Sequence, residues 1–154
     1  MAETLSFYRI DTTNNNKIDL EIGNRSVRIS GAAKVIQEIV RLLLQTPGSD
    51  EDAPGQGADL KSLVNRQVLD NGQSTQLDIV GAIRKTLRDI RANQTGHDLP
   101  GNERLANLEA LDVRYNRSEH RWLVNVRVVL EDGTNIVVDF AKLLKPLGST
   151  LFGN

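Results

Sequence analysis

The amino-acid sequence predicts an α+β domain in which two main helices pack on a three-stranded antiparallel meander. Residues 31–45 and 74–93 carry apolar side chains at three- and four-residue spacing, the period of an amphipathic helix. From Leu105 to Phe140 apolar and polar side chains alternate instead, the period of a half-buried strand. The chain has 154 residues, a length that one domain with an arm at each end accounts for.

Residues 1–30 are expected to form a strand or hairpin arm ahead of the domain. Leu5 and Phe7 alternate with Ser6, and the apolar positions of residues 18–22 alternate with acidic ones. The stretch DTTNNNK between them has turn chemistry, because asparagine tolerates left-handed backbone and bonds to its own chain. Residues 27–29 favour a further short strand.

The first main helix is expected from Gly31 to Gln45, with Ser30 as its N-cap and Pro47-Gly48 as its stop. A short helix is expected at residues 59–68. Asn71-Gly72 predicts a turn before the second main helix, which is capped by Ser74 or Thr75 and ends near Asn93. Its apolar stripe is Leu77, Val80, Ile83, Leu87 and Ile90, and its polar side is Arg84, Lys85, Arg88 and Arg91.

Three strands are expected after Leu105, joined by short hairpin connections at NRSEH and EDGT. Their inward positions are Leu111, Val113 and Tyr115, then Trp122, Val124, Val126, Val128 and Leu130, and finally Ile136, Val138 and Phe140. The tail, residues 141–154, is apolar at Leu143 and Leu144. It either packs on its own domain as a last turn or docks on a neighbour.

Composition excludes several classes of function. The chain has no cysteine, so disulfides, cysteine-ligated zinc and thiol catalysis are excluded. The formal net charge of −1 gives no basic excess for nucleic acid, and no apolar run approaches the roughly 20 residues of a membrane span. We expect no cofactor and no metal site.

The loop TPGSDEDAPGQGADL, residues 46–60, is the most unusual segment. Read as an EF-hand from Asp50, it has Pro54 and Lys61 at positions five and twelve, where calcium needs oxygen ligands. Read as a phosphate loop, it puts Asp59 where an anion would bind. It is therefore interpreted as a connector between helices, with Asp50 to Asp52 either solvated or in contact with a basic neighbour.

No enzyme signature stands out. Glu103 and Glu109 flank the start of the strands, but any acidic chain offers some carboxylate pair for glycoside hydrolysis. His97 and His120 are separated by a loop and a strand, and surface positions are their default interpretation. The chain is expected not to be an enzyme.

Several short motifs occur in a fixed order. TPGS ends the first helix, GADL at residues 57–60 opens the next, and NERLANLEALDVRY from Asn102 opens the strands. This order resembles the baseplate wedge family of contractile phage tails, which has a relative in the baseplate of type VI secretion machines. The family's Glu-Pro-Arg turn becomes Asn102-Glu103-Arg104 here, so the arginine is kept, the proline is lost and the acid is shifted by one.

The resemblance implies a non-enzymatic structural subunit of the virion, placed in the tail baseplate and assembled in the host cytoplasm. Residues 31–140 would be the wedge core domain, similar to the handshake part of the tail sheath protein. Implied partners are the wedge core bundle proteins, the tail sheath protein and other baseplate or tail tube proteins. Alternatives are a type VI secretion baseplate subunit and, from another class, a peptidoglycan-cleaving lysozyme-like enzyme.

The same resemblance implies two sets of partner-binding residues. Contact with the wedge core is expected at Asn102, Glu103, Arg104 and Leu105. Contact with the sheath or a neighbour is expected at an open sheet edge among residues 122–140, helped by the arm or the tail. The residues of this second set are Ile136, Val138, Phe140, Leu143 and Leu144.

Overall fold

The computed structural model describes the backbone of residues 4–13, 17–29, 31–66 and 72–140, and side chains within these ranges from residue 31 onward. The expected Ser30 cap and the whole tail, with Leu143 and Leu144, lie outside the described residues. Elements follow one another as β1 (Thr4–Thr13), β2 (Lys17–Ile29), α1 (Ala32–Leu44), α2 (Leu60–Val64), α3 (Gln73–Gln94), the 3₁₀ turn η2 (Gly101–Glu103), β3 (Leu105–Asn116), β4 (Arg121–Leu130) and β5 (Asn135–Asp139). The predicted α+β class is confirmed.

The described strands form one sheet in the order β1-β2-β5-β4-β3. The expected antiparallel meander is its β3-β4-β5 part, with Val128 opposite Ile136 between the last two strands. β1 and β2 form the expected hairpin, and β2 runs on to Ile29, so residues 27–29 are not a separate strand. The hairpin joins the meander because β2 pairs in parallel with β5, with Ile18 opposite Val138.

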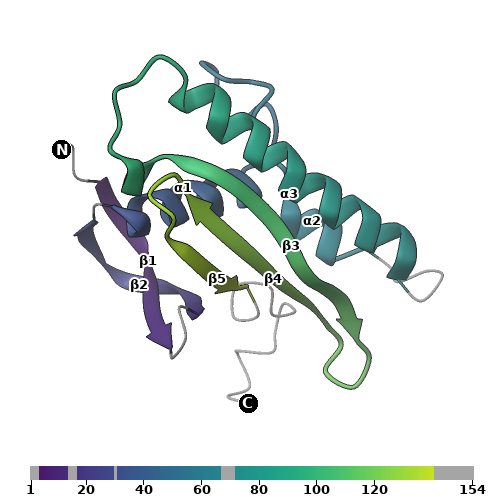
Figure 1. The fold of residues 1–154 in the computed structure, drawn as a ribbon. Helices are drawn as coiled ribbons and strands as arrows, with labels where there is room; N and C mark the ends of the chain where they lie inside the picture. Colours follow the sequence, from purple (N-terminus) through teal and green to yellow (C-terminus); the bar gives the residue numbers. More distant parts are fainter. Residues whose placement is uncertain (1–3, 14–16, 30, 67–71, 141–154) are drawn as a thin grey trace.

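Both main helices cover the same face of the sheet, α3 lying along β3 and α1 beside it (Figure 1). On β4 and β5 every second side chain is buried, as the period of two predicted. The largest fully buried side chains are Trp122 of β4 and Phe140, which follows β5, and both belong to one apolar core with Ile36 and Ile39 of α1. Each such side chain contributes about 1.5–3 kcal/mol when fully buried, so this layer supplies most of the driving force for folding.

The buried face of α3 differs from the predicted stripe. Ile83 and Ile90 are buried as expected, but Val80 and Leu87 are only partly buried and Leu77 is 73% exposed. The buried line runs instead through Thr75, Ile79, Ala82, Ile83, Thr86 and Ile90. Small side chains let the helix come close to the core, and the Thr86 hydroxyl donates to the Ala82 carbonyl at 2.9 Å, which satisfies it inside the helix.

The expected N-cap of α3 is also wrong. The helix begins at Gln73, so Ser74 and Thr75 lie within its first turn, and Gly72 holds the cap position at φ 85°. A Cβ atom on Gly72 would lie 3.0 Å from the Trp122 ring. The close approach of that ring, together with the left-handed backbone, favours glycine here over a hydroxyl cap.

One strand position was also misassigned by the simple alternation. Leu111 was expected to face inward with Val113, but it is 41% exposed. Ala110 pairs with Val126 and Asp112 with Asn125, so Leu111 is the extra residue of a β-bulge. A bulge shifts the alternation by one residue, which turns Leu111 out of the core.

Two alanine substitutions test which face of α3 is buried in the core. Ile83→Ala is expected to lower the free energy of unfolding by about 2–5 kcal/mol, because it leaves a cavity in the core. Leu77→Ala is expected to change it by less than about 0.5 kcal/mol, because the side chain is already in water. Urea unfolding of both variants measures this, and equal losses would contradict the assignment.

Candidate functional site

The turn that leads into β3 holds the N-terminus of α1. The Gly31 backbone N–H donates to Glu103 Oε1 at 3.1 Å, and Lys34 Nζ lies 3.6 Å from Glu103 Oε2. The first turn of α1 contains no acidic residue of its own. Since the N-terminus of a helix is a positive pole with unsatisfied N–H groups, Glu103 is the described side chain that accepts there, from 72 residues away in the chain.

Arg104, the next residue of the turn, contacts the C-terminal end of α3, which is the negative pole of that helix. Arg104 Nη2 donates to the His97 carbonyl at 2.5 Å and Nη1 to the Gln94 carbonyl at 3.5 Å, at the C-terminus of α3. The Gln94 amide donates to the Glu103 carbonyl and accepts from the Leu105 N–H, both at 2.9 Å. One turn therefore joins the two helix ends to the sheet.

The β4–β5 turn packs against this site from the other side. The Asp132 N–H donates to the Gly101 carbonyl at 3.3 Å, and Arg104 Nε lies 3.5 Å from Glu131 Oε2. Two hydrogen bonds from Thr134 hold the pKa of the Asp132 carboxyl below its usual range, and the one from the Thr134 side chain has a larger effect than the one from its backbone. They favour the ionised form and fix the tip of the turn beside Gly101.

The four residues expected at the wedge core contact differ in exposure. Glu103 and Leu105 are each 3% exposed, so both act inside the domain. Asn102 is partly buried, and the Arg104 side chain is 26% exposed. Arg104 lines an open depression of about 390 Å³ together with Arg91, Gln94, Thr95, Leu105, Ala106 and Glu131. Of the expected set, Arg104 and Asn102 are the residues that an outside group can reach.

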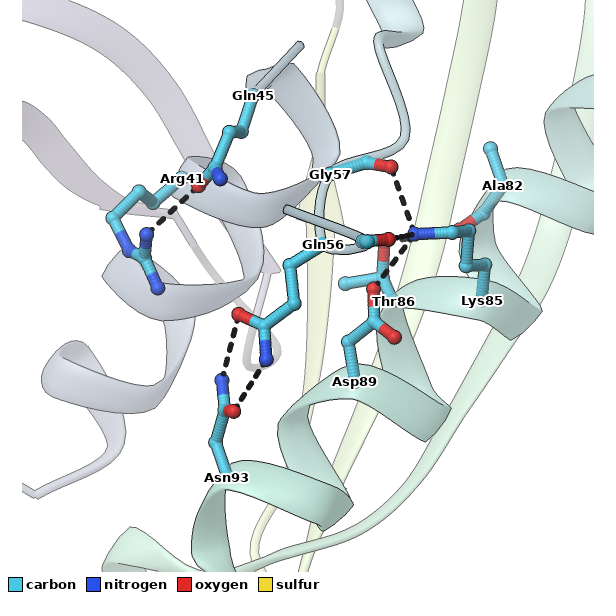
Figure 2. Close-up of polar contacts among 10 residues, drawn as sticks. Arg41, Gln45, Gln56, Gly57, Ala82, Lys85, Thr86, Asp89 and Asn93 are labelled. Carbon is cyan, nitrogen blue, oxygen red and sulfur yellow. Dashed lines mark hydrogen bonds and ion pairs between the residues drawn. The ribbon is translucent and has the colours of Figure 1, made fainter. Parts of the chain in front are cut away.

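The connector between α1 and α2 is tied down at its end rather than loose. Lys85 of α3 donates to the carbonyls of Gly55 at 2.7 Å and Gly57 at 2.9 Å, and it also pairs with Asp89 (Figure 2). The side-chain amides of Gln56 and Asn93 bond to each other in both directions (Figure 2). The connector is thus held against α3.

Backbone contacts fix the same segment to the end of α1. The Ala58 and Asp59 N–H groups donate to the carbonyls of Leu42 and Gln45, both at 3.0 Å. Gly57, at φ 110°, lies so close that a Cβ atom would be 2.5 Å from the Gln45 carbonyl oxygen. The expected short helix is confirmed as α2, Leu60–Val64, although Asp59 before it is left-handed and makes no side-chain cap.

The acidic middle of the connector faces outward. Glu51 and Asp52 are exposed and Asp50 is partly buried. The three line an open depression of about 580 Å³ with Ser49, Arg41, Leu44 and Gln45. Within the described ranges none of the three carboxylates is ion-paired. Their negative charge is therefore accessible to solvent or to a basic neighbour.

The open sheet edge does not lie where the sequence placed it. β4 is paired with β3 and β5, and β5 is paired with β4 and β2, so both are interior strands. Ile136, Val138 and Phe140 are 8%, 1% and 0% exposed. These three side chains build the core and are not surface contacts. The outer strands of the described sheet are β1 and β3.

In the described part of the chain, the histidines and the two glutamates considered for catalysis do not form one cluster. His97 follows α3 and His120 lies in the turn beyond β3, so β3 separates them. Glu103 is engaged in the cap, whereas the Glu109 carboxylate lies 3.4 Å from Arg127 on β4. Within the described ranges no three His, Cys, Asp or Glu side chains are arranged to hold a metal ion. No described helix has the length and apolarity to cross a membrane.

The cap made by Glu103 can be tested by two substitutions. Glu103→Ala is expected to lower the free energy of unfolding by about 1–3 kcal/mol, because it leaves the Gly31 N–H buried without an acceptor. Glu103→Gln keeps an acceptor oxygen and is expected to cost less. Thermal and urea unfolding measure both, and an unchanged Glu103→Ala variant would contradict the cap.

The close approach in the connector gives a second prediction. Gly57→Ala is expected to cost about 1–3 kcal/mol of stability, because a side chain at that φ is strained and meets the Gln45 carbonyl. Gly55→Ala is the matched control, since its Cβ would meet nothing within 4 Å. Urea unfolding should separate the two variants, and equal stabilities would argue against a rigid connector.

A comparison of the chain with protein-family models, with curated proteins and with solved structures finds no match. A functional proposal therefore depends on the motifs and on the contacts described above. These contacts converge on two places, the 101–105 turn and the connector.

Proposed function

We propose that this protein is a structural baseplate wedge subunit of a contractile phage tail. In this role it joins the wedge core to the tail and gives the first sheath ring a platform for assembly. The observation that carries the proposal is where the resembling motifs lie in the fold. TPGS and GADL lie at the two ends of the tied connector, and Asn102 to Leu105 form the turn that joins both helix ends to the sheet.

Motifs at such junctions fit a structural protein whose role is to present correctly placed surfaces to its neighbours. The connector and the turn fix how the helices lie on the sheet, and so they fix the surfaces that neighbouring subunits would meet. An enzyme of this size would instead need reactive side chains gathered in a pocket, and the carboxylates Glu103 and Glu109 have separate partners.

The proposed wedge core contact is centred on Arg104. Its guanidinium lines the depression beside Arg91, and Glu131 is the carboxylate of that lining. Carboxylates or backbone carbonyls of the wedge core bundle would suit this site, because the positive charges of Arg104 and Arg91 lie together in its lining. Glu103 acts here as a positioning residue, since its buried carboxylate holds the turn that carries Arg104.

The proposed sheath contact is strand addition at an outer edge of the sheet. β1 is the better candidate, because it carries one irregularity, between Ser6 and Tyr8, and its register with β2 is unbroken from Tyr8 to Thr13. β3 carries two irregularities, and bulges interrupt the regular pairing that an added strand needs. The sheath protein would thus extend the sheet on the side of the N-terminal hairpin.

The Arg104 assignment is tested by co-assembly with the wedge core proteins of the phage that encodes this chain. Arg104→Glu is expected to abolish co-purification, because it reverses the charge at the contact. Gln94→Ala is the matched control, since it loosens the same turn by about 1 kcal/mol but keeps the arginine. It is expected to retain co-purification.

Two outcomes would count against the proposal. Normal co-purification of Arg104→Glu would remove the assigned contact. A gene with no sheath, tube or wedge genes around it would remove the setting in which such a subunit works, whereas secretion-system genes there would favour the type VI alternative.

A further inference from the structure

The outward side of α3 carries a straight stripe of exposed residues that the fold does not use. Leu77, Gly81, Arg84, Arg88 and Arg91 follow one another at spacings of four and three, and each is exposed. Residues at these spacings lie along one line of a helix, here about 21 Å long. Alternate spacing of four and three is also the spacing of a seam between two packed helices.

The stripe carries positive charge that the described residues leave uncompensated. Arg84 and Arg88 have no ion pair or hydrogen bond with any other described residue, and Arg91 donates to the neutral Ala106 carbonyl. The two carboxylates of α3 are engaged elsewhere, Asp78 with Arg66 at 2.7 Å and Asp89 with Lys85 at 2.9 Å. Like charges three and four residues apart repel each other along a helix, so an acidic partner would relieve a cost already present in the fold.

The N-terminal end of the stripe, which consists of Leu77 and Gly81, carries no charge. Leu77 is 73% exposed, and the partly buried Val80 lies beside it. A Cβ atom on Gly81 would meet nothing within 4 Å, so the packing of this domain does not require glycine there. Glycine is a poor helix former, and at this exposed position it leaves the line between Leu77 and Arg84 without a side chain.

We infer that this stripe of α3 binds an acidic helix of a partner protein. The partner packs an apolar side chain against Leu77, comes close at Gly81 and places carboxylates opposite Arg84, Arg88 and Arg91. Arginine suits this role because its planar fork binds carboxylates with paired hydrogen bonds. The occupant is not the same stripe of a second copy, because six guanidinium groups would then share one seam with no carboxylate among the stripe residues.

A helix fits these observations better than nucleic acid does. Phosphates would use the three arginines, but they gain nothing from an exposed leucine and a glycine gap. The stripe also lacks an aromatic side chain on which a base could stack. The inference goes beyond the proposed wedge function and does not depend on it. The stripe shares only Arg91 with the depression that Arg104 lines, and Leu77, Gly81, Arg84 and Arg88 are not part of that lining.

The test uses a fluorescent helical peptide of about 21 residues. One face of the peptide carries leucine and alanine on two turns and glutamate on the next three, and a second peptide has glutamine in place of glutamate. Fluorescence anisotropy at low ionic strength is expected to show binding of the glutamate peptide and at least about tenfold weaker binding of the glutamine peptide.

Two matched substitutions locate the binding surface. Arg88→Glu is expected to weaken the glutamate peptide at least about tenfold. Arg114→Glu changes the net charge equally on the sheet, where Arg114 pairs with Asp112, and is expected to have little effect. Leu77→Ala is expected to weaken binding while the Tm stays unchanged.

Gly81→Ala separates binding from folding. Because the added Cβ meets no neighbour and alanine favours the helix, the Tm is expected to rise by about 2–4 °C. Binding of the peptide is expected to weaken, because the gap is filled. Opposite changes in Tm and affinity would be hard to explain by a structural role of Gly81 alone.

Three results would overturn the inference. The first is no binding of the glutamate peptide at low ionic strength. The second is equal effects of Arg88→Glu and Arg114→Glu. The third is binding of a short duplex DNA with the same dependence on Arg88 but none on Leu77 or Gly81, which would assign the stripe to nucleic acid. Loss of wedge co-assembly in Arg104→Glu with unchanged peptide binding would leave both proposals standing.

Discussion

The buried carboxylate of Glu103 is the contact on which the arrangement of both helices depends. It accepts the Gly31 N–H at the start of α1, while Arg104 beside it donates to carbonyls at the end of α3. A carboxylate at a helix N-terminus and a guanidinium at a C-terminus both match the helix dipole. Because the two residues are consecutive, one short turn fixes the start of one helix relative to the end of the other.

The connector gives a second fixed point at the opposite end of α1. Lys85 and the Gln56–Asn93 amide pair hold it to α3, and Gly57 lets it pass close to the Gln45 carbonyl (Figure 2). With α1 held at both ends, charged side chains without an ion pair within the described ranges remain on the surface, in the acidic middle of the connector and at Arg84 and Arg88 of the α3 stripe. A rigid scaffold with opposite charges on separate surfaces suits a subunit that is bound by several neighbours.

The N-terminal hairpin changes which parts of the sheet are open to a partner. Because β2 pairs with β5, the last strand of the meander is interior and its side chains complete the core with Trp122. Strand addition is left to the outer strands β1 and β3. Any partner that extends the sheet beside β1 therefore contacts the hairpin and not β5.

The sequence by itself determined the class of the fold, both main helices, strand structure in the N-terminal arm and the inward residues of β4 and β5, because periods of 3.6 and 2 are local properties of the chain. It also determined that residues 46–60 connect two helices and that the strands of the meander begin near Leu105. Only the tertiary structure decided that Glu103 is a cap, that Leu77 and Leu111 are exposed and that β5 is interior. Each of these depends on groups far away in the chain or on a single bulge, and no local period contains that information.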